Sequence, residues 1–366
     1  MHKSLKPQKL IKIIPGVVLA LVFCLFSQGI NNLIAIEFFN TAKSPISTVM
    51  IAILLGIIMG NAFTPRPGMM LGLDFTQKYI LKLGIIFLGI RLSFGDFLKF
   101  GTIAIPLIIV CIFSVLVLIK LLIKKVPISS KMSYLIAIGT SVCGATAIVA
   151  TAPVINAKKT EVAYAIANIT LFGVIAMLVY PYFAEWYFYG ESLQAGLFLG
   201  TAIHETSQVA AAGLIYDQQF NSPETLNVAT VTKLIRNTFL VVMIPLFAFL
   251  YNRGEIKDKS YSILSIFPYF VIGFIGMIIV RNIGDQIFTI EKGNYEIWEI
   301  FINYIKILAT VFLTMAMAAV GISINLSELR SMGYKPFVVG LIAAVTVGVV
   351  SIISMESILK LNSTLF

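Results

Sequence analysis

The sequence predicts an all-α polytopic membrane protein, and three observations carry that prediction. Of the 366 residues, 58% are hydrophobic and only 12% are charged, whereas soluble domains carry about 25% charged residues. The apolar runs are about 20 residues long, the length that an α-helix needs to cross the hydrocarbon core. The alternation of apolar and polar residues that is typical of a transmembrane β-barrel is absent. We therefore expect the lipid bilayer to be a partner of the whole chain, residues 1–366.

The charge pattern predicts orientation in a membrane. The net charge of +10 comes mostly from loop lysines, so it does not indicate nucleic-acid binding. Residues 1–14 contain four lysines and are predicted to form a cytoplasmic tail, at the inner (cell) membrane of a bacterium. The apolar run that follows lacks a small-residue cleavage site, so a signal peptide is not expected. The three cysteines show no metal-binding spacing, and no disulfide, metal or cofactor is expected.

The apolar runs predict about eleven segments, and their boundaries follow from charges, prolines and glycines. A turn at TPRPG (64–68) ends the second segment. The predicted ranges are 15–36, 46–63, 79–92, 102–122, 133–157, 162–183, 193–215, 227–251, 263–280, 298–322 and 337–358.

Two pairs of similar segments predict an internal duplication of the chain. GIRLSFGDFLKFG (89–101) resembles GISINLSELRSMG (321–333), and IGTSVCGATAIVATA (138–152) resembles LGTAIHETSQVAAAG (199–213). In transporters such pairs accompany inverted repeats, here about 46–183 and about 191–360 within a single transmembrane domain.

Segments 133–157 and 193–215 are unusually rich in small and polar residues. Two geometries fit them: a broken helix that crosses fully, or a re-entrant segment that turns back. Both geometries bring the two polar centres near the membrane midplane.

The second of these segments holds the residues from which we predict proton coupling. His204 and Glu205 stand side by side in an apolar span, where ionisable groups normally face a cavity or a partner. Histidine titrates near neutral pH, and the adjacent acid can share its proton. The alternative is a buried histidine that a neighbouring hydroxyl satisfies. Thr206, Ser207 and Gln208 follow directly and are predicted to bind substrate.

Lys233 and Arg236 are three residues apart, so they share a helix face deep in an apolar span. Two buried cations predict an anionic partner, which is either a ligand or Glu205. A salt bridge to Glu205 without any ligand role is the alternative.

The first small-residue segment is predicted to complete an oxyanion site. Its hydroxyls and free amides suit an anion, because the N-terminus of a broken helix presents unpaired N–H groups. The alternative is close helix packing through small residues, and Cys143 is expected to be a small buried residue rather than a nucleophile. The predicted residues are Thr140, Ser141, Cys143, Gly144 and Thr146.

These motifs carry a resemblance to a known family. SVCGATAIVATAPVI, GTAIHETSQVAAA and KLIRN, in this order, resemble the bacterial YeiH-type family, whose members are described as sulfate exporters. PRPG near Pro67 and LGIIFLGIRLS also fit. The resemblance implies a multi-pass inner-membrane protein with two inverted repeats, related to the grouping of cation/proton antiporters and anion transporters. It also implies a sulfur oxyanion substrate, such as sulfate, sulfite or an organosulfonate. A homodimer is suggested by family analogy alone.

The predicted function is a secondary transporter that exports a small inorganic or sulfonate anion with proton coupling. A cation/proton antiporter that uses Glu205 and His204 is the main alternative. An intramembrane enzyme is not expected, because neither HExxH nor GxSxG occurs in the sequence. A non-transporting sensor would need an output domain, which the sequence does not contain.

Overall fold

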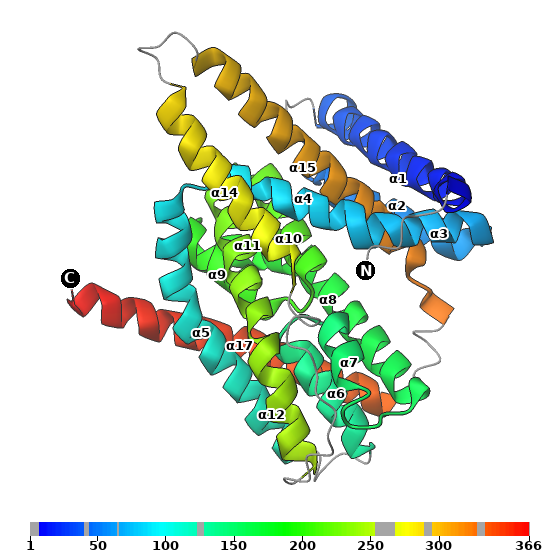
Figure 1. The fold of residues 1–366 in the computed structure, drawn as a ribbon, viewed down its shortest axis with the longest axis vertical. Coiled ribbons are helices and arrows are strands. Elements are labelled where there is room, and N and C mark those ends of the chain that lie inside the picture. Colours follow the sequence, from blue (N-terminus) through cyan, green and yellow to red (C-terminus); the bar gives the residue numbers. More distant parts are fainter. Residues whose placement is uncertain are drawn as a thin grey trace. The chain divides into compact units, whose positions relative to one another are not determined.

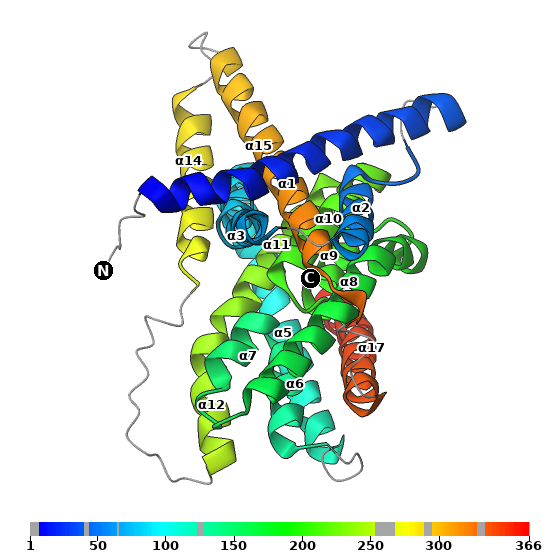
Figure 2. The ribbon, with the colours of Figure 1, turned by 90° about the vertical axis from the view of Figure 1, so that its right-hand side faces the viewer.

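The structure, a computed structural model, confirms the all-α prediction (Figures 1 and 2). It describes residues 7–39, 44–63, 66–122, 128–252, 268–288, 295–327 and 334–365. In these ranges the chain is helical with short connections and has no strand. Seven of the described helices are long and apolar enough to cross a membrane. The predicted total of eleven segments and the predicted repeats stay predictions.

The chain forms two compact units, and the first comprises residues 1–94, 214–221 and 270–326. Within it, α15 packs against α1, α2 and α4, while α14 packs against α4. A helical path runs from residue 67 to residue 91 without a break, because the π-helix η2 joins α3 to α4 and a 3-10 turn, η3, follows. The elements are α1 (Pro7–Leu33), η1 (Ile34–Phe38), α2 (Thr48–Ala62), α3 (Pro67–Phe75), η2 (Thr76–Ile80), α4 (Leu81–Leu88), η3 (Gly89–Arg91), α14 (Phe270–Ile287) and α15 (Tyr295–Ser323).

The second unit comprises residues 95–213, 222–269 and 327–366. Its helices are α5 (Phe94–Leu122), α6 (Ser130–Ser141), α7 (Ala145–Thr151), α8 (Lys159–Phe188), α9 (Ser192–Ala202), α11 (Pro223–Thr238), α12 (Leu240–Asn252) and α17 (Tyr334–Leu365). Helix α10 (Thr206–Phe220) begins in this unit and ends in the first.

Helices α6 and α7 form a hairpin. The start of α6 lies beside the start of α8, where Ser129 Oγ donates to Glu161 Oε1 at 2.5 Å. The chain beyond α7 returns to the same place, since Lys131 Nζ donates to the Asn156 carbonyl at 2.7 Å. Helix α6 has 12 residues and is therefore about 18 Å long, roughly half of the 30 Å hydrocarbon core.

Helices α9 and α10 form a second hairpin. Ser192 Oγ lies 2.7 Å from Ser222 Oγ, and Thr225 Oγ1 donates to the Ser192 carbonyl at 3.1 Å. The start of α9 and the turn after α10 therefore lie together. Helix α9 follows the C-terminus of α8, whereas α6 starts beside its N-terminus. The two hairpins consequently start at opposite ends of α8, which is the arrangement that the re-entrant alternative predicts.

Several predicted helix boundaries are wrong; α5, for example, begins at Phe94 rather than at residue 102. The first helix begins at Pro7 and contains Pro15, so the described part of the predicted tail is helical. The third begins at Pro67 rather than at residue 79, because TPRPG ends one helix but also places a proline at the first position of the next, where its fixed φ is favourable. Helix α14 covers Phe270–Ile287 rather than 263–280. The first five residues of the predicted range, 263–267, lie outside the described residues.

Glycines allow α2 and α15 to approach closely in the first unit. A Cβ atom added to Gly56 would lie 2.6 Å from the Ala318 carbonyl oxygen, and one added to Gly60 would lie 2.1 Å from that of Ile322. Small residues commonly serve this purpose between membrane helices.

We expect Gly56→Ala to lower the free energy of unfolding by about 1–3 kcal/mol, since the new methyl group overlaps a backbone that cannot move away easily. The measurement is the thermal unfolding midpoint in detergent. Gly276→Ala in α14 is the matched control, because a Cβ atom there meets nothing within 4 Å. Equal midpoints for the two variants would contradict this account of the α2–α15 contact.

Candidate functional site

The tips of the two hairpins carry carbonyl groups that need donors. Helix α6 ends at Ser141 and α9 ends at Ala202, and the last carbonyls of a helix have no partner within it. Inside a membrane, water does not readily replace the missing donors. Lys233 and Arg236, on α11, supply them.

The ammonium group of Lys233 donates hydrogen bonds only to backbone carbonyls. Its Nζ donates to Val142 at 2.9 Å, to Ile203 at 3.0 Å and also to His204. An ammonium group has three N–H donors, so all three are occupied. Lys233 is fully buried.

Arg236 bridges the ends of both hairpins. On the α6 side, Nε donates to the Ser141 carbonyl at 2.8 Å and Nη2 donates to that of Thr140. On the α9 side, Nη1 donates to the Thr201 carbonyl and to that of Ile203 at 3.4 Å. Cations are favourable at helix C-termini because the macrodipole is negative there. In the part of the chain that the structure describes, neither cation forms an ion pair with Glu205.

The N-terminal ends of the returning helices face Glu205. Its Oε1 accepts a hydrogen bond from the Ala145 backbone N–H, at the start of α7, at 3.4 Å. Its own backbone N–H donates to Gln208 Oε1 at 3.2 Å, in the first turn of α10. Gly144 has a φ of +67°, and a Cβ atom there would lie 2.4 Å from Glu205 Cγ. Only glycine therefore lets the carboxylate approach the α7 N-terminus.

The other predicted residues fall into two groups. The hydroxyls of Thr140 and Ser141 donate back within α6, to Ile136 at 2.8 Å and Ala137 at 2.7 Å. Their protons are therefore not directed at a ligand. Cys143 is buried at the break between α6 and α7.

Near Glu205 the structure gathers further polar groups in the first turn of α10. Thr206 is half-buried and Thr146, in α7, is exposed, whereas Ser207 is buried. Thr206 Oγ1 accepts from Asn237 Nδ2 at 2.9 Å, and Gln208 Nε2 donates to the Thr170 carbonyl at 3.3 Å. Asn237 was not among the predicted residues, although it follows Arg236 directly in the KLIRN motif.

His204 lies at the tip of the second hairpin and is almost completely buried. Its carbonyl accepts from Lys233, while its ring Nδ1 has no hydrogen-bond partner among the described residues. With both basic side chains charged, Lys233 and Arg236 carry two positive charges against the single carboxylate of Glu205. The hairpin tips then have an excess of one positive charge.

Comparison with known proteins places the chain in a family. The sequence model of the family described as conserved hypothetical protein 698 matches residues 15–340. The chain belongs to this family. Relatives of this kind include a UPF0324 membrane protein of Streptococcus agalactiae, 34% identical over 320 residues, which cover 86% of this chain and 90% of the relative. Another, from Photorhabdus laumondii, is 32% identical over 343 residues, 90% of this chain and 89% of the relative. No solved structure matches the chain.

For this member of the conserved hypothetical protein 698 family, we expect Lys233→Met to destabilise the folded state without any ligand present. The variant leaves the Val142 and His204 carbonyls without their donor and Ile203 with only its bond from Arg236. Each carbonyl that water cannot reach costs about 1–3 kcal/mol. The thermal unfolding midpoint in detergent, without added anions, measures the effect. The matched control is Lys99→Met in α5, where the lysine is exposed. An unchanged midpoint for Lys233→Met would show that the carbonyl contacts contribute nothing.

Proposed function

We propose that this protein is a secondary transporter that exports a small anion, most specifically a sulfur oxyanion such as sulfate or sulfite, with proton coupling. The observation that carries the proposal is the arrangement of charge at the hairpin tips. Two buried cations and the N-termini of α7 and α10 supply positive potential, and one half-buried carboxylate opposes them. Helix N-termini bind oxyanions through their free N–H groups.

The anion would bind where the Glu205 carboxylate now lies. Carboxylate and oxyanion compete for the same N–H groups, such as that of Ala145. Protonation of Glu205 removes its charge and favours the anion, so anion and proton would move together. A dianion with one proton keeps one negative charge. An inside-negative potential drives that charge outward by about 2.3 kcal/mol per 100 mV, which fits export.

Lys233 and Arg236 would act on the anion through their field rather than by direct contact. All three N–H donors of Lys233, and the Nε, Nη1 and Nη2 groups of Arg236, bond to carbonyls. Thr206, Ser207 and Gln208 are the side chains of α10 nearest to Glu205 in sequence and complete the proposed site, together with Thr146 on α7. The bacterial inner membrane, with the N-terminus in the cytoplasm, is part of the same proposal.

A cation/proton antiporter that uses Glu205 and His204 is the second candidate. It is favoured by the half-buried carboxylate of Glu205, which could exchange a proton for a metal cation. The excess positive charge at the tips opposes this candidate, because a cation would approach Lys233 and Arg236. Sodium-dependent pH changes in vesicles would favour it over anion export.

We expect proteoliposomes that contain the wild type to transport sulfite or sulfate faster as the pH falls, because protonated Glu205 vacates the site. Glu205→Gln should keep the flux and lose the share of the pH response that Glu205 contributes, which for one titrating group is at most about tenfold per pH unit. Glu224→Gln, an exposed acid in the first turn of α11, is the matched control. If a folded wild type moves no sulfur oxyanion under any gradient, the substrate class is wrong.

His204→Asn tests the second proton group separately. We expect the variant to flatten the pH dependence of flux, because the substitution removes a ring that can accept and release a proton. Flux at a fixed acidic pH should change little, since the ring Nδ1 accepts no hydrogen bond from the described N–H groups that would hold the anion. A pH profile identical to that of the wild type would remove His204 from the coupling mechanism.

A further inference from the structure

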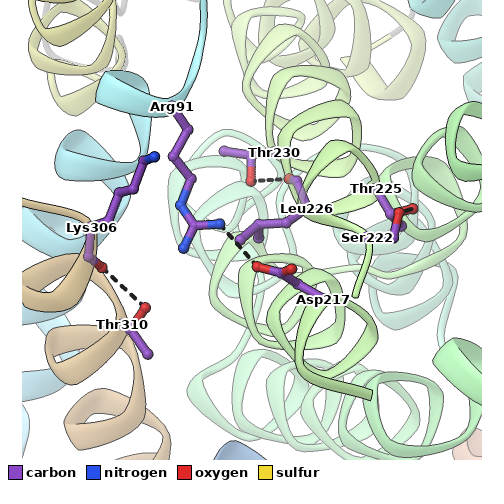
Figure 3. A network of polar contacts seen from close by, with 8 residues as sticks. All are labelled: Arg91, Asp217, Ser222, Thr225, Leu226, Thr230, Lys306 and Thr310. Carbon is purple, nitrogen blue, oxygen red and sulfur yellow. Dashed lines mark hydrogen bonds and ion pairs between the residues drawn. The ribbon is translucent and has the colours of Figure 1, made fainter. Parts of the chain in front are cut away.

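The first unit contains a second cluster of charged side chains, which the proposed site does not use (Figure 3). Arg91 closes the 3-10 turn η3, Asp217 lies near the C-terminal end of α10, and Lys306 lies in α15. These elements are distant in sequence, and the fold of this unit brings the three side chains together. Arg91 and Asp217 are largely shielded from solvent, with 12% and 18% of their side chains exposed, and Lys306 is half-buried.

Arg91 is only partly satisfied by its acidic partner. Its Nη1 donates to Asp217 Oδ2 at 2.9 Å. Its Nε is buried and has no hydrogen-bond partner in the described part of the chain. A buried N–H group of a guanidinium is rarely left unpaired, because its desolvation is then uncompensated. Such an orphan donor indicates a water molecule or an anion at that position.

Lys306 brings a second positive charge to the same place. Figure 3 shows its side chain beside that of Arg91, and the charges of Arg91 and Asp217 both act on it. The ion pairs described in this unit join Arg91 to Asp217 and Arg281 to Asp285, so Lys306 has no carboxylate partner among them. Glu299 also acts on Lys306, but it is exposed and lies two turns earlier in α15.

Two cations therefore share one carboxylate in a place that is partly shielded from water. Like charges repel each other more strongly there than in water, so the arrangement favours a further anion. A purely structural ion pair would need only Arg91 and Asp217, and it would leave neither the Nε orphan nor the second cation explained. The planar guanidinium fork and an ammonium group together suit the several oxygens of a tetrahedral oxyanion.

We propose that Arg91 and Lys306 form a second anion site, which takes a tetrahedral oxyanion and in which Asp217 is the resident competitor. The site lies in the first unit and shares no residue with the hairpin tips. It rests on the proposed function only in the expectation that the transported oxyanion is one of its ligands. A phosphate group of a lipid headgroup has the same chemistry and is the other source of ligand.

The test is sulfate and phosphate binding to the purified full-length chain in detergent, measured by titration calorimetry. We expect Asp217→Asn to tighten the binding about tenfold and Lys306→Met to weaken it about tenfold, which corresponds to about 1.4 kcal/mol in opposite directions. Lys82→Met, an exposed lysine in α4, should leave the affinity unchanged. Arg91→Lys keeps the charge but loses the planar fork, and it should weaken binding less than Lys306→Met does.

A second arm identifies the source of the ligand. Displacement of bound sulfate by phosphatidylglycerol, but not by phosphatidylcholine, supports a lipid phosphate as the ligand. Binding that neither lipid affects supports the free anion. Equal oxyanion affinities for the wild type, Asp217→Asn and Lys306→Met, all folded by size exclusion and thermal midpoint, overturn the second site.

Failure of the second site is distinguishable from failure of the proposed function. If the protein transports sulfur oxyanions but Asp217→Asn and Lys306→Met bind them with wild-type affinity, the second site is wrong and the proposed transport function stands. If Asp217→Asn binds more tightly and Lys306→Met more weakly but no flux is seen, the second site stands and the proposed transport function is wrong.

Discussion

The hydrogen bonds from Lys233 and Arg236 to backbone carbonyls are the interaction on which the second unit depends. A hairpin that turns back inside the hydrocarbon core exposes helix ends where water cannot serve as the donor. Two such hairpins meet here. The C-terminal ends of α6 and α9 lie close enough for the Arg236 guanidinium to reach the carbonyls of both Thr140 and Thr201. The buried charges and the open helix ends would each be costly alone. Placed against each other, the charges and the carbonyls satisfy one another.

The C-terminal and N-terminal helix ends at the hairpin tips have different charged partners. The C-terminal ends of α6 and α9 lie against cations, whereas the N-terminal end of α7 lies against Glu205. The cations are fully buried, and carbonyls take the three N–H donors of Lys233 and four of the five of Arg236. Glu205 and Thr206 stay partly accessible. Any ligand that reaches the tips therefore meets amide N–H groups and one carboxylate first. This asymmetry connects the packing of the hairpins to the anion chemistry that we propose.

The sequence alone located the central residues but not their partners. Lys233, Arg236, His204 and Glu205 stand out because charged residues are rare within apolar spans. The acceptors of the two cations could not be predicted, since every residue has the same backbone carbonyl and only the fold decides which ones lack a donor. Arg91 and Asp217 are 126 residues apart in sequence. Near the end of a predicted helix, Arg91 alone gives no signal of a partner.

The small residues of the two unusual segments serve the packing that places the cations. Helix α11 runs beside α9, and Cβ atoms added to Gly196 and Gly200 would lie 2.5 Å from Val228 Cβ and 2.6 Å from Thr232 Cβ. Side chains at these glycines would push α11 away and withdraw Lys233 from the carbonyls. For the first segment, close packing and an oxyanion site were the alternative interpretations. In the second segment the glycines serve close packing, and they bring α11 near enough for its cations to hold the hairpin tips.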